Sequence, residues 1–326
     1  MRKLLTIMAI ALCSTLTIAQ TNQYFWYKGN LMMGNPIAQI DSVTFGENEL
    51  TDTLHILLPR TIIKEVHDTT IAIVHDTIII HDTINICAFP NGAVNGKFSV
   101  SPTIQVYFSQ GNLQYQPQTQ RWRFADNQYD VIGEDNKNIS SSYSGWIDLF
   151  GWGTGNNPLN TSMTDSDYPS FSEWGNNMIA NSVSMGWRTL TTEEWTYLFS
   201  SRANANNLYS QVSIGNQHGM IVFPDNWVQP TSIPFTAQAN NWTTNVYTQE
   251  QWERLESLGA VFLPAAGTRN GTSVGVVNYD GNYWSSTKVN EQTLSIYIMY
   301  NPYHLALNCR QERHFGFSVR LVQDVK

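Results

Sequence analysis

The chain has 326 residues and a formal net charge of −8, and 12% of its residues are aromatic while only 13% are charged. An acidic chain of this kind is poorly suited to nucleic acid or anionic lipid, so neither is expected as a partner. High aromatic content with low charge is typical of a large core, and it also occurs on surfaces that bind carbohydrate or protein.

The first twenty residues have the layout of a secretory signal. A basic start is followed by an apolar run up to Leu12, and cleavage is expected after Ala19. The run is too short to span a bilayer, and no later segment reaches that length. A lipoprotein anchor at Cys13 is disfavoured, because Leu12 is larger than the small residue that such a site requires. We therefore expect residues 1–19 to be a signal peptide and the mature chain to be exported, to the periplasm, the cell surface or the medium.

Three segments are predicted to follow the signal. Residues 20–49 are expected to form a small β element, with turns at Lys28-Gly29-Asn30 and Gly34-Asn35-Pro36. Residues 50–89 are rich in Asp-Thr pairs, and we expect them to form an extended, β-rich stalk. The turn-rich stretch "FPNGAVNGKF" marks the next boundary, and residues 90–326 suit a single main domain.

The stretch "VHDTTIAIVHDTIIIHDTI", residues 66–84, repeats His-Asp-Thr three times. Its histidines, His67, His75 and His81, are 8 and then 6 residues apart. Even spacing in a strand places each histidine on the face of the threonines, while each aspartate points the other way. A nucleophilic triad therefore cannot assemble within one repeat. A metal site would need paired strands to bring histidines together, and we favour none.

The second half of the repeat resembles a modification motif. Asp-(Ser/Thr)-aliphatic-or-Thr is similar to the O-glycosylation sequon of exported proteins in Bacteroidota-type bacteria. Attached sugars would solvate a segment that has no core of its own. The alternative is an unmodified β-stalk that pairs with copies of itself. The five candidate attachment residues, all before the main domain, are Ser42, Thr53, Thr69, Thr77 and Thr83.

Two helices are predicted in the main domain from capping boxes. In "GWRTLTTEEW", Thr191 is the expected N-cap and Glu194 its partner three residues later. In "YTQEQW", Thr248 and Gln251 repeat the pattern, and Gly259 is expected to end that helix. The expected hydrophobic staples are Leu190 with Trp195 and Tyr247 with Trp252.

Several separated segments carry a family resemblance. Gly186-Trp187-Arg188, with Thr191, Glu194 and Trp195, resembles the helix-start motif of the formylglycine-generating-enzyme-like branch of the C-type lectin fold. "NYWSST" (282–287) and "GFSVRLV" (316–322) resemble its closing segments. Together with residues 98–115 and 262–271, they resemble the Fibrobacter-type major paralogous domain proteins of Bacteroidota-type bacteria. The resemblance implies an α+β, C-type-lectin-like domain with a small mixed β-sheet, two main helices and long loops.

The chain departs from the catalytic and calcium-binding members of that fold, many of whose members only bind. Members that oxidise cysteine hold copper with two close cysteines near the C-terminus, whereas Cys309 stands alone there. The calcium-binding motifs are not matched by "QPT" or "DNW" (229–231 and 225–227), so no metal site is expected. We expect no enzymatic activity and no cofactor. Cys87 and Cys309 could form one disulfide or remain separate thiols.

The resemblance also suggests where a ligand binds. In the diversity-generating relatives of this fold, the binding surface lies between the Trp-Ser-Ser segment and the closing Gly-Phe strand, here residues 287–314. Alternation predicts that Leu294, Ile296 and Ile298 face inward. The predicted outward-facing set is rich in types that make binding hot spots, and an ordinary solvent face is the alternative. That set is Tyr297, Tyr300, Tyr303, His304, Asn308 and Arg310.

Other aromatic and basic residues of the main domain are expected to be structural. We expect His304 and His314 at the surface, without metal-ligand spacing. Five tryptophans are expected in the core rather than as sugar-binding platforms: Trp146, Trp152, Trp187, Trp195 and Trp284.

The expected function is that of an exported, non-enzymatic recognition or adhesion protein whose lectin-like head binds a glycan or a surface protein. A structural subunit of an envelope or pilus-like assembly, self-associating through residues 50–89, is one alternative. A hydrolase with an unrecognised site is another, although no nucleophile–base pair, metal cluster or phosphate loop supports it.

Overall fold

The computed structural model describes six strands within residues 25–81, and residues 90–180, 186–289 and 294–326 of the rest. Within the ranges 90–180, 186–289 and 294–326, side chains are described except at residues 294–296. The chain divides into two compact units, Met1–Ala88 and Phe89–Lys326. None of the described helices is long and apolar enough to cross a membrane. Several predictions fall outside the described residues: the signal peptide (1–19), His67, His75, Cys87, Thr53, Thr69 and Thr83.

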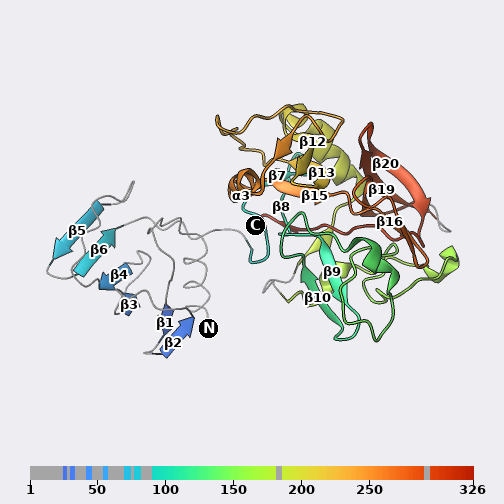
Figure 1. The fold of residues 1–326 in the computed structure, drawn as a ribbon, viewed down its shortest axis with the longest axis horizontal. Coiled ribbons are helices and arrows are strands. Elements are labelled where there is room, and N and C mark those ends of the chain that lie inside the picture. Colours follow the sequence, from blue (N-terminus) through green and yellow to red (C-terminus); the bar gives the residue numbers. More distant parts are fainter. Residues whose placement is uncertain are drawn as a thin grey trace. The chain divides into compact units, whose positions relative to one another are not determined.

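The first unit contains strands that fold back on one another (Figure 1). Val74 pairs with Thr77 in the antiparallel β5–β6 hairpin, so the chain reverses between them, where we expected one extended segment. Pairing satisfies backbone N–H and C=O groups that a lone strand would leave exposed. Ser42 and Thr77 lie on β3 and β6. One sheet is β1 (Phe25–Tyr27) with β2 (Asn30–Met33); the other has the order β3 (Ser42–Phe45), β4 (Leu54–Leu57), β6 (Thr77–His81), β5 (Thr70–Val74).

The second unit is mixed α+β, built mostly from strands with two short α-helices. Its larger sheets have the orders β11-β21-β8-β7, β14-β12-β13-β15 and β18-β19-β20, and β9 with β10 and β16 with β17 form hairpins. The first of these sheets contains β7 (Phe98–Ser99), β8 (Gln105–Phe108), β11 (Arg188–Thr189) and β21 (Leu321–Asp324). The second contains β12 (Tyr209–Ile214), β13 (Gln217–Val222), β14 (Val246–Tyr247) and β15 (Val261–Pro264).

The third sheet and the hairpins complete the strands of this unit. The sheet contains β18 (Gly281–Val289), β19 (Leu294–Asn301) and β20 (His304–Glu312). The hairpin strands are β9 (Leu113–Gln116), β10 (Arg121–Phe124), β16 (Thr268–Asn270) and β17 (Ser273–Gly275). Short 3-10 turns lie at Gly133–Lys137, Asp165–Asp167, Trp174–Asn176 and Ala205–Asn207.

Helix α2 (Thr192–Thr196) begins at the predicted capping box. The Thr191 hydroxyl accepts a bond from the Glu194 N–H at 3.2 Å, and the Glu194 carboxylate accepts one from the Thr191 N–H at 2.8 Å. The same carboxylate forms a two-bonded ion pair with Arg188, at 2.7 Å for each bond. Arg188 also bonds Asp324 at 2.7 Å, which ties the helix start to β21. The helix continues as one π-helical turn, Tyr197–Ser201.

Helix α3 (Gln249–Ser257) confirms the second capping box and its predicted end. Thr248 and Gln251 exchange bonds of 3.2 and 2.9 Å. Gly259 has a φ of +97°. Its N–H bonds the Glu256 carbonyl, and the next N–H bonds the Leu255 carbonyl, which is the Schellman arrangement.

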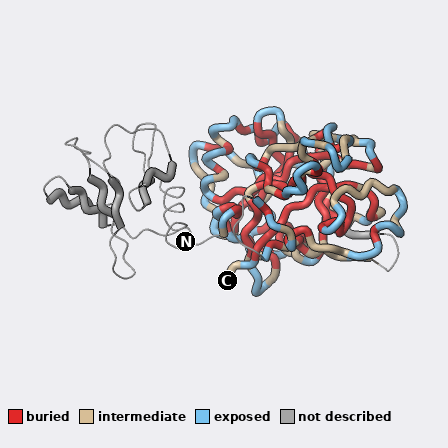
Figure 2. The backbone as a smooth tube through the Cα atoms, turned by 90° about the horizontal axis from the view of Figure 1, so that it is seen from below, coloured by how far each residue is buried: buried red, intermediate tan, exposed pale blue. Residues whose placement is uncertain are grey.

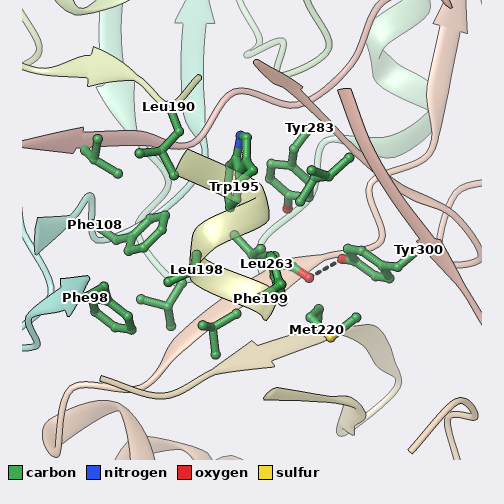
Figure 3. Packing of buried hydrophobic residues seen from close by; sticks show 14 of the residues in the cluster. Phe98, Phe108, Leu190, Trp195, Leu198, Phe199, Met220, Leu263, Tyr283 and Tyr300 are labelled. Carbon is green, nitrogen blue, oxygen red and sulfur yellow. Dashed lines mark hydrogen bonds between the residues drawn. The ribbon is translucent and has the colours of Figure 1, made fainter. Parts of the chain in front are cut away.

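Three hydrophobic clusters make the core of the second unit. Figure 2 shows its buried residues in red, in the interior of this unit. The first core surrounds α2 and includes Leu190, Trp195, Tyr283, Ile298 and Tyr300 (Figure 3). The second includes Trp122, Phe150, Trp284, Tyr297 and Phe317. The third, around α3, includes Ile221, Tyr247, Trp252, Leu255 and Phe262. Each predicted staple pair therefore lies within a single core.

Candidate functional site

Three of the five segments that carry the family resemblance contact one another. The Thr192 N–H donates to the Thr287 hydroxyl at 3.0 Å, and the Thr192 and Ser285 hydroxyls are 2.9 Å apart. The Trp284 N–H donates to the Ser318 carbonyl at 3.1 Å. These bonds join the start of α2, strand β18 and the C-terminal segment. The motifs therefore connect α2, β18 and the C-terminal segment next to β19, which pairs with β18.

The predicted binding segment forms the last two strands of the β18-β19-β20 sheet, with β19 in the centre and β20 at the edge. Each face of this sheet covers a different core. Tyr283 of β18 and its partner Ile298 of β19 belong to the first core. Trp284 and its partner Tyr297, on the opposite face, belong to the second.

The prediction that Tyr297 and Tyr300 face outward is wrong. Tyr297 is 8% exposed, and its ring centroid lies 4.5 Å from that of Phe317. Tyr300 is fully buried, and its hydroxyl donates to the Leu263 carbonyl (Figure 3). Burial raises the pKa of Tyr297 to about 12, so its phenol stays neutral. Both faces of β19 are covered. Alternate side chains of this strand therefore enter the first and the second core, and neither set faces solvent.

The other four predicted residues do reach solvent, along the edge strand and its preceding turn. Tyr303 is 79% exposed. His304, Asn308 and Arg310 on β20 are also exposed. No side-chain hydrogen bond or ion pair of these four occurs within the described part of the chain. We call this set, Tyr303, His304, Asn308 and Arg310, the β20 surface.

A β-bulge shapes the β20 surface. Tyr297 pairs with Cys309 while Met299 pairs with Ala306, so two steps on β19 match three steps on β20. Leu305, which pairs with Tyr300, and Leu307 pack against the first core, while Asn308 stays exposed. Bulges re-aim side chains at sheet edges. The bulge also shifts the alternation along β20. His304 pairs with Asn301 and Arg310 with Ile296, so these two side chains lie on opposite faces of the sheet. Along the strand and its preceding turn, the β20 surface offers a phenol, an imidazole, an amide and a guanidinium, which can donate and accept hydrogen bonds.

Cys309 is a free, partly buried thiol. It lies beside Tyr297, and burial raises the pKa of the thiol. Cys309 forms no disulfide within the described residues, and Cys87 lies outside them. Within the described ranges, no group of three or more His, Cys, Asp or Glu side chains is placed to hold a metal ion.

Two further sequence expectations are wrong in part. His314 is 9% exposed rather than at the surface, and its Nδ1 lies 2.8 Å from the Asp165 carboxylate. Four of the five tryptophans expected in the core are buried. Trp146 is the exception, since it keeps part of its surface in solvent. The Arg123 guanidinium lies 4.1 Å from the centroid of its ring.

Sequence reasoning did not single out the surroundings of Trp146. The signal was present in "RWRF" (121–124), where arginine and aromatic residues alternate as on a strand with one buried face. Trp122 and Phe124 are buried, whereas Arg121 is exposed and Arg123 partly so.

The chain was compared with protein-family models, curated proteins and solved structures, and none of the three comparisons finds a match.

Proposed function

We propose that this chain is an exported, non-enzymatic recognition or adhesion protein whose C-type-lectin-like head binds a glycan or a surface protein. The observation that carries the proposal is the β20 surface. It places four hydrogen-bonding side chains, including a tyrosine that is 79% exposed, along one strand edge. Tyrosine and arginine are enriched among residues that dominate binding energy. The head would belong to the formylglycine-generating-enzyme-like branch of that fold, as a Fibrobacter-type major paralogous domain protein.

The turn between β19 and β20 is fixed by hydrogen bonds, which supports a binding role for the β20 surface. The turn before β20 is held by the Tyr303 N–H, which donates to the Asn301 side chain at 3.2 Å. The Asn301 carbonyl accepts a bond from the Gln211 side chain at 2.5 Å. A surface anchored in this way loses little conformational entropy on binding, which favours affinity.

A glycan and surface-protein array probed with the mature chain from Gln20 tests the proposal. We expect saturable binding that falls about tenfold in Tyr303→Ala, the equivalent of about 1.4 kcal/mol. Val228→Ala is the matched control, because Val228 is 80% exposed but lies outside the β20 surface. The absence of any ligand, or an equal loss in both variants, would refute this use of the β20 surface.

A structural subunit of an envelope or pilus-like assembly is the second candidate. The observation that favours it is the position of β3 and β5 at the two edges of the β3-β4-β6-β5 sheet. Edge strands can pair with another chain. This function would be favoured by self-association that depends on residues 50–89, together with no binding to any ligand on the array. Glycosylation of the Asp-Thr sites would oppose such pairing.

A further inference from the structure

The polar face of the β9–β10 hairpin is a second surface with its own chemistry, and it lies apart from β19 and β20 (Figure 1). Gln114 pairs with Arg123, and Gln116 with Arg121. Residues that are paired directly across two strands share a face. These four side chains therefore lie on one side of the hairpin. The opposite side carries Tyr115 and Trp122, which belong to the second core.

Trp146 joins the polar face from a neighbouring segment. Tyr115 and Ile147 form a bridge, with both backbone bonds at 2.9 Å, so this segment runs alongside β9. Ile147 is fully buried in the second core. Successive side chains of an extended segment point to opposite faces, which places Trp146 on the polar side. The Gln116 side chain donates to the Ser144 carbonyl at 2.6 Å and holds the segment in place.

Arg123 is fixed in position over the indole of Trp146. Its Nε donates to the Gln114 side chain at 2.9 Å, and one terminal nitrogen donates to the Asp126 carboxylate at 2.8 Å. Its side chain is 26% exposed, and that of Asp126 is 66% exposed. A guanidinium held by three contacts is pre-organised for a further partner. The cation–π contact adds to this rigidity.

Arg121 leaves the face with an uncompensated positive charge. It is exposed, and no bond or ion pair of its guanidinium occurs within the described residues. Asp126 already pairs with Arg123, so the charge of Arg121 is the surplus. A positive surplus stands out on a chain whose formal net charge is −8. Two arginines two residues apart on one strand face lie about 7 Å from each other, so a ligand with a negative group at Arg121 also reaches Arg123 and Trp146.

We propose that this face, built from Trp146, Arg123 and Arg121, binds a polysaccharide that contains uronic acids. Arginine matches a carboxylate with two parallel hydrogen bonds. Arg123 lies over one face of the indole, and the part of the ring that stays in solvent offers an apolar surface for the C–H face of a sugar ring. A polymer with a sugar ring and a carboxylate in each unit can contact the arginines through its carboxylates and the indole through its rings. An acidic peptide would satisfy the charge alone.

The test is titration calorimetry of the mature chain with an oligogalacturonide. The same oligomer with its carboxylates methyl-esterified is the matched ligand control, because only the charge is removed. We expect binding to the acid form that weakens with added salt, and no binding to the ester. We expect affinity to fall about tenfold or more in Arg121→Gln, because the charge-assisted hydrogen bonds of its guanidinium to a carboxylate are lost. Trp146→Ala is expected to abolish binding.

Arg254→Gln is the matched protein control, since it removes an equal charge from an exposed position on α3. Its affinity should equal that of the unaltered protein. Arg121 has no bonding partner among the residues that the structure describes, so the unfolding midpoint of Arg121→Gln should be unchanged. No binding, equal binding of the ester, or an equal loss in Arg254→Gln would overturn the proposal. Equal affinity for polyglutamate would also overturn it, by showing an acidic partner without a sugar requirement.

Discussion

Asp148 is a fully buried carboxyl group whose ionisation makes the stability of the second unit depend on pH. Its side chain accepts bonds from the Ile132 N–H at 3.0 Å and from the Asn136 amide at 2.7 Å. Burial raises the pKa of Asp148 from its ordinary value of 3.8 to about 6, although these hydrogen bonds oppose the rise. Between these two pKa values, Asp148 therefore keeps its proton in the native protein but has released it in the unfolded chain.

The sign and size of the effect follow from this difference. Below the unfolded pKa of 3.8, Asp148 is protonated in both states, and its contribution to stability is fully present. As the pH rises through the folded pKa of about 6, that contribution is lost. A shift of about 2 pKa units corresponds to about 3 kcal/mol in the free energy of unfolding.

Urea unfolding across this pH range, of the unaltered protein and of Asp148→Asn, measures the effect. The amide cannot ionise, so the difference between the two free energies of unfolding should change by about 3 kcal/mol between about pH 4 and about pH 8. The unaltered protein should be relatively more stable at the acid end. The absolute cost of the variant does not enter, because only the change with pH is compared.

Asp135→Asn provides the matched control, because Asp135 is an exposed carboxyl group in the 3-10 turn that also contains Asn136, the partner of Asp148. Its difference from the unaltered protein should stay nearly constant across the range. A difference between Asp148→Asn and the unaltered protein that does not vary with pH would refute the reasoning.

Three further predictions concern local structure and modification. Thr191→Ala should lower the free energy of unfolding by about 1 kcal/mol and leave ligand binding unchanged, with Thr191→Ser as the control. Loss of binding with an unchanged free energy of unfolding would contradict a structural role for Thr191. Gly259→Ala should lower the free energy of unfolding in denaturant by about 2 kcal/mol or more, because alanine is strained at a positive φ and its Cβ would lie only 2.3 Å from the Asn95 carbonyl oxygen. An unchanged unfolding midpoint would contradict this prediction. In a host that makes the modification, intact-mass measurement should show a hexose-containing excess that is mostly lost when valine replaces Thr69, Thr77 and Thr83. The excess should persist when glutamine replaces His67, His75 and His81, and its loss there would contradict the motif assignment.

The sequence by itself determined the features that depend on a few neighbouring residues. Both helix starts follow from capping boxes, because the bonds at Thr191 and Thr248 join groups only three residues apart. The end of α3 follows from Gly259, since a positive φ is a local requirement. Alternation also predicted correctly that His304 and Asn308 stay exposed.

Only the tertiary structure decided what covers each face of a strand. Alternation shows that Tyr297 and Ile298 point opposite ways, but not that Phe317 covers one side and the core around α2 the other. The same limit applies to Trp146, which faces away from a core that its neighbour Ile147 joins. It applies as well to His314, which meets Asp165 from a distant part of the chain. Periodicity reports the direction of a side chain, whereas its burial depends on partners that are brought together only when the whole chain folds.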